Sequence, residues 1–376
     1  MSILNRNVYC ILGLPFDVVT LAEATEKVDS AMNATERLLL TTPNLNFSIT
    51  SLTDAVFFQS VIDSDLIVAD GMPIIWIAKL LGVPLSERVA GSDLFAALSA
   101  QLGRDKKKSV FFFGGQEGIA EQACQQLNKS SYAMSCCGFY DPGFVSIEAM
   151  STPEIIGLIN ACHPDFLVVA LGAKKGQDWI QKSQQQLNAT VISHLGAVVN
   201  FVAGNVERAP VFWQRLGMEW LWRIKQEPAL WQRYGYDGLV FLRLLLFKVL
   251  PLALYDHSMK FSSIFKAPVC INCQESGHHT ILILSGSVHK ASLESVKRCF
   301  ADRLNDGKGD IMLNCSQLTY IDGAFIATLM LFQRYLNEQN RQLYLQDVPK
   351  RISLILNLNN SLNRFKLRTS VQVVCK

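Results

Sequence analysis

Asp70 is the first side chain whose type and position suggest catalysis. It follows the apolar run Asp65–Ala69 and precedes Gly71 and Pro73. A carboxylate at the end of a strand could act as a general base, which requires a pKa raised toward neutrality. It could also cap the helix that Pro73 opens, and capping would lower its pKa. The sequence leaves both roles open.

A second loop carries a cation. Arg88 stands ahead of the small residues Gly91, Ser92 and Asp93, which precede a helical pattern. The guanidinium is suited to clamp a phosphate or a carboxylate. Ser92 or Asp93 could simply cap the helix that follows.

A third loop is rich in glycine. Gly114, Gly115 and Gly118 lie between an apolar run and a helical pattern. Their backbone N–H groups could hold a diphosphate at a helix N-terminus, or the glycines could only make a tight turn. The spacing lacks the full dinucleotide-binding pattern, so both interpretations remain.

Basic and aromatic residues alternate along residues 208–248, where seven basic and three acidic residues give a charge of +4. Arg215, Trp220, Arg223 and Arg233 belong to this segment. The charge is thin for nucleic-acid binding. Aromatic residues among cations are typical of a membrane interface, although a helical hairpin packed on the protein body would serve equally well.

The next apolar stretch, between Asp237 and Asp256, contains only Arg243 and Lys248 as charges. A membrane-spanning helix needs ~20 apolar residues, and this stretch carries two cations and Pro251. We therefore expect a buried helix or a helix on a membrane surface rather than a span.

The chain of 376 residues has 49% hydrophobic and 18% charged residues and a net charge of +3. This apolar content excludes a disordered chain, and the length predicts two or three domains. Residues 1–207 hold 13 basic and 20 acidic residues. A protein that coats nucleic acid would be strongly basic, so we expect no nucleic-acid partner.

The ten cysteines do not predict a disulfide framework in so long a chain. Cys270 and Cys273 form one CxxC without a second pair, so reduced thiols are favoured over a zinc site. Pro15 and Asp17 interrupt the N-terminal apolar run, so no secretory signal is expected. A cytoplasmic location follows.

Strand-like runs alternate with helical patterns over the first ~200 residues, which predicts an α/β, Rossmann-like, mostly parallel sheet with flanking helices. Thr20 and Glu23 form a capping box for the first helix. Polar or glycine-rich loops, including Gly172–Gly176, follow the carboxyl ends of the strands, where such sheets bind ligands. Strands are expected at 38–40, 65–69, 110–113, 166–171 and 190–193.

Residues 256–268 lose this pattern and are predicted to be a linker. A small α/β domain should follow, with alternating strand and helix patterns. We therefore divide the chain into a body (1–207), a helical C-terminal appendage of that body (208–255), the linker (256–268) and the small domain (269–376).

Five blocks, in the right order, resemble the WecG/TagA/CpsF family, glycosyltransferase family 26, over residues 3–250. They are TTPNLNF (41–47), ADGMPIIWIAKLLGVPLSERVAGSDL (69–94), FFFGGQEGIAE (111–121), PDFLVVALGAKKG (164–176) and NVERAPVFWQRLGMEWLWRIKQEP (205–228). The resemblance implies an inverting enzyme that moves a sugar from a UDP-sugar to a polyprenyl-diphosphate-linked acceptor. The sugar would be of the N-acetylmannosamine type or a related hexose, and the product would enter surface polysaccharide.

The resemblance assigns roles to particular residues. Asp70 matches the catalytic base, Thr42 and Asn44 match an active-site motif, and Arg88 matches an arginine near the departing diphosphate. No metal or other cofactor is implied. The positions implied for substrate binding are Arg88, Gly91, Ser92, Asp93, Gly114, Gly115, Gly172, Lys175, Gln177 and Arg208.

The basic aromatic segment matches the family's C-terminal appendage. The resemblance implicates it in completing the site and in binding the inner membrane surface. Arg215, Trp220, Arg223 and Arg233 are therefore assigned to contacts with the membrane or the acceptor. The protein is predicted to be peripheral on the cytoplasmic face of the membrane.

One loop departs from the family pattern G-x-P-K-Q-E. Lys175 is kept, but the family's glutamine is replaced by Gly176 and its glutamate by Gln177. Because the family's glutamine contributes to the active site, either Gln177 substitutes for it by one register step, or activity and donor choice differ.

Residues 269–376 resemble a STAS domain, the fold of anti-sigma-factor antagonists. LILSGSV (282–288), DIMLNCSQLTYIDGAFIATLMLFQRYL (310–336) and RQLYLQDVP (341–349) carry that likeness. Phosphorylated STAS domains have a serine after an aspartate, whereas Gly323 follows Asp322 here. A module that docks a protein partner is therefore expected rather than a phosphorylation switch.

Two other functions stay open. A catalytically degenerate transferase body could present the STAS-like domain to a regulator, as a scaffold. A nucleotide-dependent oxidoreductase would rest on the glycine turn alone. Homo-oligomer formation is left undecided.

Overall fold

The computed structural model describes residues 3–101, 106–206, 209–210, 212–213, 217–226, 228–276, 279–307 and 309–369. Arg208 and Arg215, assigned above to substrate and membrane contacts, lie outside the described residues. The chain forms two compact units. The large-sheet unit contains Val19–Trp76 and Leu85–Leu239, and the small-sheet unit contains Met1–Val18, Ile77–Pro84 and Val240–Lys376.

The large-sheet unit is built on a six-stranded sheet of order β4-β3-β8-β7-β5-β6, and all neighbouring strands are parallel. This confirms the predicted α/β fold. Its strands are β3 (Leu38–Thr41), β4 (Leu66–Ile67), β5 (Lys108–Gly114), β6 (Met134–Tyr140), β7 (Phe166–Ala170) and β8 (Val191–His194).

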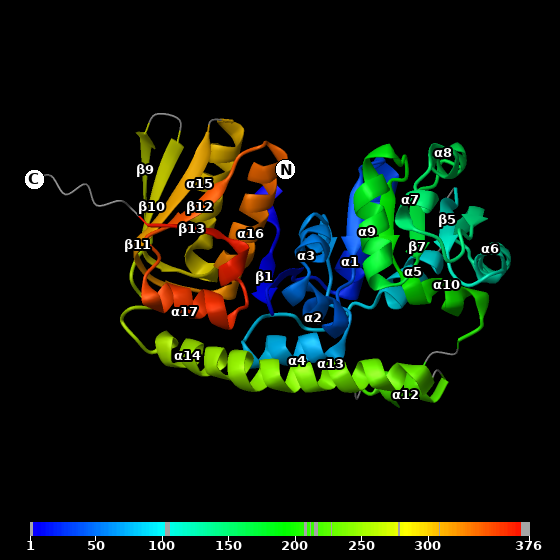
Figure 1. Ribbon diagram of the computed structural model, residues 1–376, viewed down its shortest axis with the longest axis horizontal. Helices are drawn as coiled ribbons and strands as arrows, with labels where there is room; N and C mark the ends of the chain where they lie inside the picture. Colours follow the sequence, from blue (N-terminus) through cyan, green and yellow to red (C-terminus); the bar gives the residue numbers. More distant parts are fainter. Residues whose placement is uncertain are drawn as a thin grey trace, which may run out of the picture. The chain divides into compact units, whose positions relative to one another are not determined.

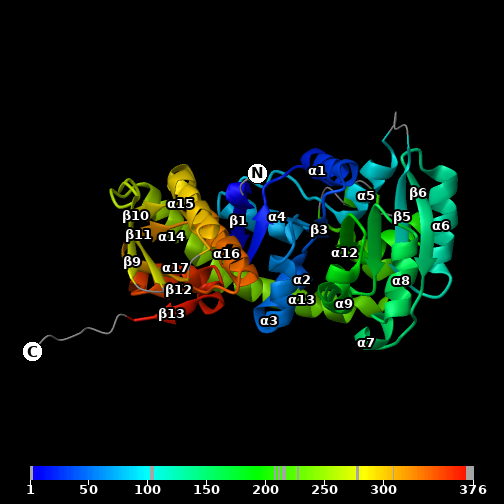
Figure 2. The same cartoon turned by 90° about the horizontal axis from the view of Figure 1, so that it is seen from above.

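Helices cover both faces of this sheet, with α1 and α5 on one side and α7, α8 and α9 on the other (Figure 2). The capping box at Thr20 is confirmed at the start of α1. The helices that lie wholly or partly in this unit are α1 (Leu21–Ala34), α2 (Leu45–Thr53), α3 (Ala55–Ile62), α4 (Met72–Leu80), α5 (Gly91–Ser99), α6 (Ile119–Ser130), α7 (Ile147–Met150), α8 (Pro153–Ala161), α9 (Ala173–Ser183), α10 (Gly196–Ala203), α12 (Glu219–Gln226) and α13 (Trp231–Leu244).

Strand β5 shows how the core forms. Val110 and Phe112 lie in the apolar cluster of one face, and Phe111 and Phe113 in the cluster of the other. Successive side chains of a strand point to opposite faces, so a strand covered on both sides must be apolar throughout. This explains why the sheet strands are continuous apolar runs in the sequence.

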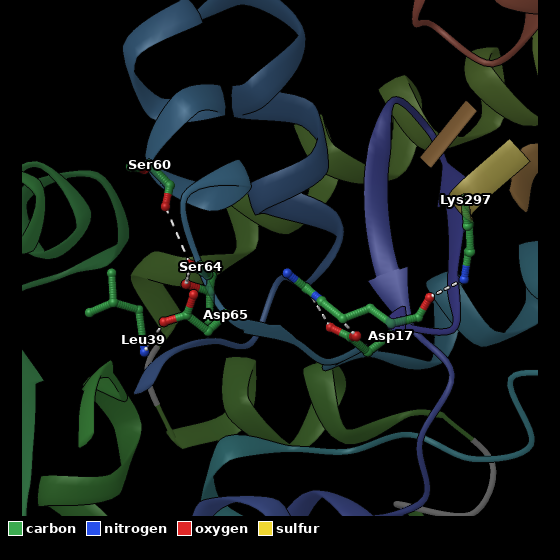
Figure 3. Close-up of polar contacts among 8 residues, drawn as sticks. Asp17, Leu39, Ser60, Ser64, Asp65 and Lys297 are labelled. Atoms are coloured by element: carbon green, nitrogen blue, oxygen red, sulfur yellow. Dashed lines mark hydrogen bonds and ion pairs between the residues drawn. The ribbon is translucent and has the colours of Figure 1, made fainter. Parts of the chain in front are cut away.

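Polar side chains fix the edge strand β4 beside β3 (Figure 3). The Asp65 carboxylate accepts a hydrogen bond of 3.0 Å from the backbone N–H of Leu39. The hydroxyls of Thr41 and Ser64 are 2.5 Å apart. These contacts hold a strand of only two residues in register, although five were predicted.

Two predictions about this unit are wrong. Residues 173–176 are not a loop, because α9 begins at Ala173 directly after the turn at Gly172, whose φ is +82°. The cysteines are not all reduced, because Cys124 of α6 and Cys136 of β6 form a disulfide. Their Cα atoms are 5.1 Å apart, a separation that a disulfide can bridge.

The small-sheet unit contains a five-stranded sheet of order β13-β12-β11-β10-β9, in which only the pair β9–β10 is antiparallel. Its strands are β9 (Cys270–Ser276), β10 (His279–Val288), β11 (Asp310–Ile321), β12 (Leu343–Gln346) and β13 (Lys366–Arg368). Its helices are α14 (Leu250–Lys260), α15 (Leu293–Asn305), α16 (Gly323–Glu338) and α17 (Lys350–Leu358). Because α14 runs to Lys260, the predicted linker starts as helix.

The N-terminal hairpin of β1 (Val8–Ile11) and β2 (Leu14–Asp17) also belongs to the small-sheet unit. Strand β1 lies beside α16 (Figure 1). The guanidinium of Arg6 donates to both carboxylate oxygens of Asp17, at 3.0 and 2.6 Å, and Lys297 of α15 donates to the Arg6 carbonyl at 2.7 Å (Figure 3). The first residues of the chain are thus packed with its last hundred.

One helix among the described residues, Trp231–Lys260, is long and apolar enough to cross a membrane by length and composition. It comprises α13, a π-helical turn at Leu245–Val249, and α14. The mean hydropathy of its most apolar window is 1.9, and only 17% of that window is buried. The interpretation as a buried helix is therefore wrong.

Candidate active site

Three loops converge at the carboxyl edge of the large sheet. The Asp70 N–H donates to the Pro43 carbonyl at 3.0 Å, and the Val89 N–H donates to the Ala69 carbonyl at 2.9 Å. The loop after β3, the loop after β4 and the segment before α5 are therefore held together by backbone hydrogen bonds. The candidate catalytic residues predicted from the sequence come from these loops.

Asp70 is at the centre of this group. Burial raises the pKa of its carboxyl group to about 6, and the negative charge of Glu219 adds to this rise. The positive charges of Arg88 and Arg223 lower the pKa but do not outweigh burial. The carboxylate accepts a hydrogen bond from the backbone N–H of Gly91 at the start of α5. The side chain keeps part of its surface exposed. A mostly buried carboxylate that keeps some exposed surface and has a pKa near neutrality is suited to accept a proton.

Arg88 forms ion pairs with two carboxylates. It donates to Asp93 at 3.2 Å and to Glu219 of α12. Asp93 therefore pairs with Arg88 rather than capping α5, whose N-cap is Ala90 and has no side-chain cap. The guanidinium stays charged at any working pH and could exchange these carboxylates for phosphate oxygens.

Helix α12 brings two charges to the site that the sequence did not place there. Glu219 pairs with Arg88, and Arg223 is close enough to lower the pKa of Asp70. The Arg223 guanidinium also lies 5.8 Å from the centre of the Phe201 ring. Arg223 was assigned from the sequence to contacts with the membrane or the acceptor, and Glu219 was not singled out. Their spacing of four residues puts both on one helix face, which is the signal that could have found them.

The two other predicted catalytic residues have structural contacts as well. Thr42 is buried, and its Oγ1 lies 3.5 Å from the position that a Cβ on Gly91 would take. That same Cβ would be 2.4 Å from the terminal methyl group of Leu195, so a larger residue at position 91 would force Leu195 to move. The Asn44 side-chain oxygen caps α2 by accepting from the Phe47 N–H at 3.2 Å. Both residues thus shape the loop beside Asp70.

The glycine turn after β5 is explained by packing. A Cβ on Gly114 would lie 2.6 Å from the Leu171 side chain, and the φ of Gly114 is +91°. The Gly115 N–H donates to the Ala170 carbonyl at 2.9 Å. The tight-turn interpretation therefore accounts for both glycines, and a phosphate contact there stays a prediction.

Within the described residues, α5, α6, α9 and α10 start at this edge without a side-chain cap. Uncapped N–H groups and the helix dipole favour anions at such ends. Gly172 precedes α9, and Lys175 is half-buried in its first turn. Gln177 is 2% exposed and donates to the Thr41 hydroxyl at 3.5 Å, so it supports β3.

Ser92 is the second residue of α5. It lines a cavity of about 370 Å³ between α5, α6 and α10, together with Phe95, Val198 and Phe201.

Trp220 and Arg233 both lie near Tyr234. The ring centres of Trp220 and Tyr234 are 6.2 Å apart, and the Arg233 guanidinium is 5.1 Å from the centre of the Tyr234 ring.

Within the described part of the chain, no group of three or more His, Cys, Asp or Glu could hold a metal ion. Metal independence stays a prediction.

Comparison with known proteins identifies this arrangement. Residues 9–253 match the model of the glycosyl transferase WecG/TagA/CpsF family. The chain belongs to that family. The match includes every loop of the site and the appendage helix α12. Residues 271–361 match a second model, described as Mlab, STAS domain.

Two curated members of the family share the printed name N-acetylglucosaminyldiphosphoundecaprenol N-acetyl-beta-D-mannosaminyltransferase. The one from Bacillus spizizenii is 33% identical over 168 residues, which are 44% of this chain and 63% of that protein. The one from Staphylococcus aureus is 26% identical over 215 residues, which are 57% of this chain and 82% of that protein. A solved anti-sigma factor antagonist from Mycobacterium paratuberculosis is 9% identical, with a TM-score of 0.26, over 27% of this chain and 87% of that one.

Proposed function

We propose that this chain is an inverting glycosyltransferase that acts in surface polysaccharide synthesis. Its donor would be a UDP-sugar carrying an N-acetylmannosamine-type sugar or a related hexose, and its acceptor a polyprenyl-diphosphate-linked glycan. The observation that carries the proposal is the partly buried Asp70 at the carboxyl edge of the sheet, whose carboxyl pKa is raised to about 6 by burial, close to Arg88. Family membership and the names of the relatives support the same chemistry.

The reaction would proceed in one displacement. The acceptor hydroxyl oxygen attacks the anomeric carbon as its proton passes to the Asp70 carboxylate. The bond from the anomeric carbon to the diphosphate oxygen breaks, and UDP leaves with the electron pair. Arg88 and the uncapped helix starts would stabilise the negative charge that develops on the diphosphate. One inversion at the anomeric carbon follows from a single displacement.

A donor screen tests this proposal. The full chain is incubated with a panel of UDP-sugars and a polyprenyl-diphosphate-linked N-acetylglucosamine acceptor, and UDP release is measured. Release with at least one donor, dependent on the acceptor, is expected. Binding of a UDP-sugar without release under any condition would instead favour the degenerate, scaffold interpretation, in which the STAS-like domain serves a protein partner.

Membrane association is the second part of the proposal. Leu239, Leu246 and Leu254 are seven and eight residues apart and 71%, 47% and 72% exposed, so they mark one apolar face of the long helix. Such a face, flanked by cations and tryptophan, would lie in the headgroup region of the cytoplasmic leaflet. The lipid-linked acceptor would reach the site from that surface.

Replacing Leu239, Leu246 and Leu254 together with serine is expected to lower partitioning onto anionic vesicles by at least about tenfold. Each leucine withdrawn from the interface removes part of its transfer free energy, and ~1.4 kcal/mol corresponds to one factor of ten. Vesicle sedimentation measures the effect. Leu158→Ser, which removes an exposed leucine from α8, is the matched control and should leave partitioning unchanged. Equal pelleting of the triple variant and the wild type would contradict membrane docking by this face.

A further inference from the structure

His194 is a buried histidine at the same edge of the large sheet that the sequence analysis did not single out. It is the last residue of β8 and lies opposite Val169 of β7. Its side chain is 8% exposed, and its Nε2 atom is buried without a hydrogen-bond partner in the described part of the chain. Buried polar atoms are nearly always paired, so this one indicates a missing partner.

The imidazole occupies the space beside position 176. A Cβ built on Gly176 would lie 2.2 Å from His194 Cδ2 and 3.1 Å from Nε2. A Cβ on Gly196 would lie 3.3 Å from the same Nε2. The ring is therefore held between the first turns of α9 and α10, and no side chain can stand at position 176 while it is there. This is the position at which the family pattern has glutamine.

The surroundings of Nε2 favour an oxygen-bearing ligand. Helices α9 and α10 both start without a side-chain cap. Burial lowers the pKa of the imidazole to about 4, so the ring is neutral at pH 7. A neutral ring can use Nε2 as a single hydrogen-bond donor or acceptor, according to its tautomer. An anion at the uncapped helix starts would favour the tautomer in which Nε2 donates.

We propose that His194 is a binding residue of the donor site, whose imidazole takes the place of a side chain at position 176 and offers Nε2 to an oxygen of the nucleotide-sugar donor. The inference rests on the proposed transferase function. It also explains the altered loop, because the polar group absent at Gly176 is supplied by the neighbouring strand.

A double-mutant cycle tests, without any assay of activity, whether the imidazole takes the space of a side chain at position 176. Gly176→Gln alone is expected to lower Tm by about 3–8 °C, because the new side chain meets the ring. His194→Gly alone should also lower Tm, since it leaves a cavity. The double variant should be more stable than either single one, because glutamine then fills the space of the ring. Additive losses in the double variant would overturn the proposed exchange of positions.

Kinetics with the UDP-sugar test whether His194 Nε2 contacts the donor. His194→Leu replaces the imidazole with an apolar side chain of similar bulk, which removes the polar nitrogen. It is expected to raise KM for the UDP-sugar about 3- to 10-fold, with kcat changed less than twofold. His194→Gln should restore KM to within about twofold of the wild type. A leucine variant with wild-type KM, or a glutamine variant as weak as leucine, would show that His194 only fills space.

Calorimetric titration with UDP separates this inference from the proposed function. If the wild type binds UDP and His194→Leu weakens binding by the same factor, the inference stands even when no donor supports turnover. If the wild type turns over a UDP-sugar and His194→Leu leaves both KM and UDP affinity unchanged, the inference fails while the transferase function stands. If the wild type binds no UDP, both fail.

Discussion

Replacing Asp70 with asparagine is expected to lower kcat by about 10²- to 10⁴-fold, the range for loss of a general base. Asparagine has nearly the same shape but cannot accept the acceptor's proton. Affinity for the UDP-sugar should stay within about twofold, because Arg88, the residue proposed to contact the diphosphate, is unchanged. UDP release under saturating substrates measures kcat, and titration measures affinity. Asp141→Asn, which makes the same change just after β6, is the matched control and should retain full activity.

The pH dependence follows from the pKa of about 6 at Asp70. The base must be ionised to accept a proton. We therefore expect kcat/KM to be constant above about pH 7 and to fall about tenfold per pH unit well below pH 6. An activity that persists undiminished at pH 5 would show that another group takes the proton.

The stability of the folded protein should change with pH in the direction opposite to that of activity. The carboxyl pKa of Asp70 is about 6 in the folded protein and 3.8 for the unperturbed group, so folding favours its protonated form. The contribution of Asp70 to the free energy of unfolding therefore falls as pH rises from about 4 to about 6, and stays low above that. Asp70→Asn removes a desolvated charge and should stabilise the large-sheet unit by about 1–2 kcal/mol at pH 7. Inactivity combined with lower stability would point to misfolding instead.

Replacing Phe16 with alanine is the second large expected effect. Phe16 is 0% exposed in the N-terminal hairpin. Its removal should lower the free energy of unfolding of the small-sheet unit by about 3–5 kcal/mol, the cost of deleting a buried aromatic side chain. Hydrogen exchange followed by mass spectrometry should show lost protection in β11 and α16, which lie more than 290 residues away in sequence.

Phe57→Ala is the matched control. Phe57 is also 0% exposed, but it belongs to α3 of the large-sheet unit. Its replacement should reduce protection in the large sheet and leave β11 and α16 unchanged. Loss of protection in the large sheet after Phe16→Ala, with β11 and α16 intact, would contradict the placement of the hairpin.

The ion pair of the hairpin gives an independent variant. Arg6→Ala leaves the Asp17 carboxylate, which is 5% exposed, without its two guanidinium hydrogen bonds. Removing one partner of a buried ion pair costs about 3–5 kcal/mol, so a similar loss is expected in the same unit. Lys290→Ala removes only an exposed side chain that donates to Asn7, and it should cost less than 1 kcal/mol.

These contacts link the two family-matched regions of the chain. The transferase match begins at residue 9, inside the hairpin, yet the hairpin packs in the unit that contains the STAS match at 271–361. The boundaries of the two matched regions therefore do not coincide with those of the two compact units. The compact unit that contains the STAS match thus also holds the first part of the sequence that the transferase model matches.

The sequence alone determined the parallel α/β architecture, the family and the candidate base. Strands covered on both faces must be apolar throughout, and carboxyl-edge loops carry the polar residues, so both leave local patterns. Asp70 was found because it directly follows the apolar run that contains β4. Thr42, Asn44 and Arg88 were found because their motifs are contiguous.

Only the tertiary structure decided which distant residues meet. Glu219 and Arg223 act on Arg88 and Asp70 from more than 130 residues away. His194 fills the space left at Gly176, and the first hairpin packs on a helix near the end of the chain. Each of these depends on how two elements pack, and the local spacing of residues carries no record of that. The physical reason is that the periodicity of apolar residues shows which face of a helix or strand is buried. It does not show which element packs against that face, because that element can come from a distant part of the sequence.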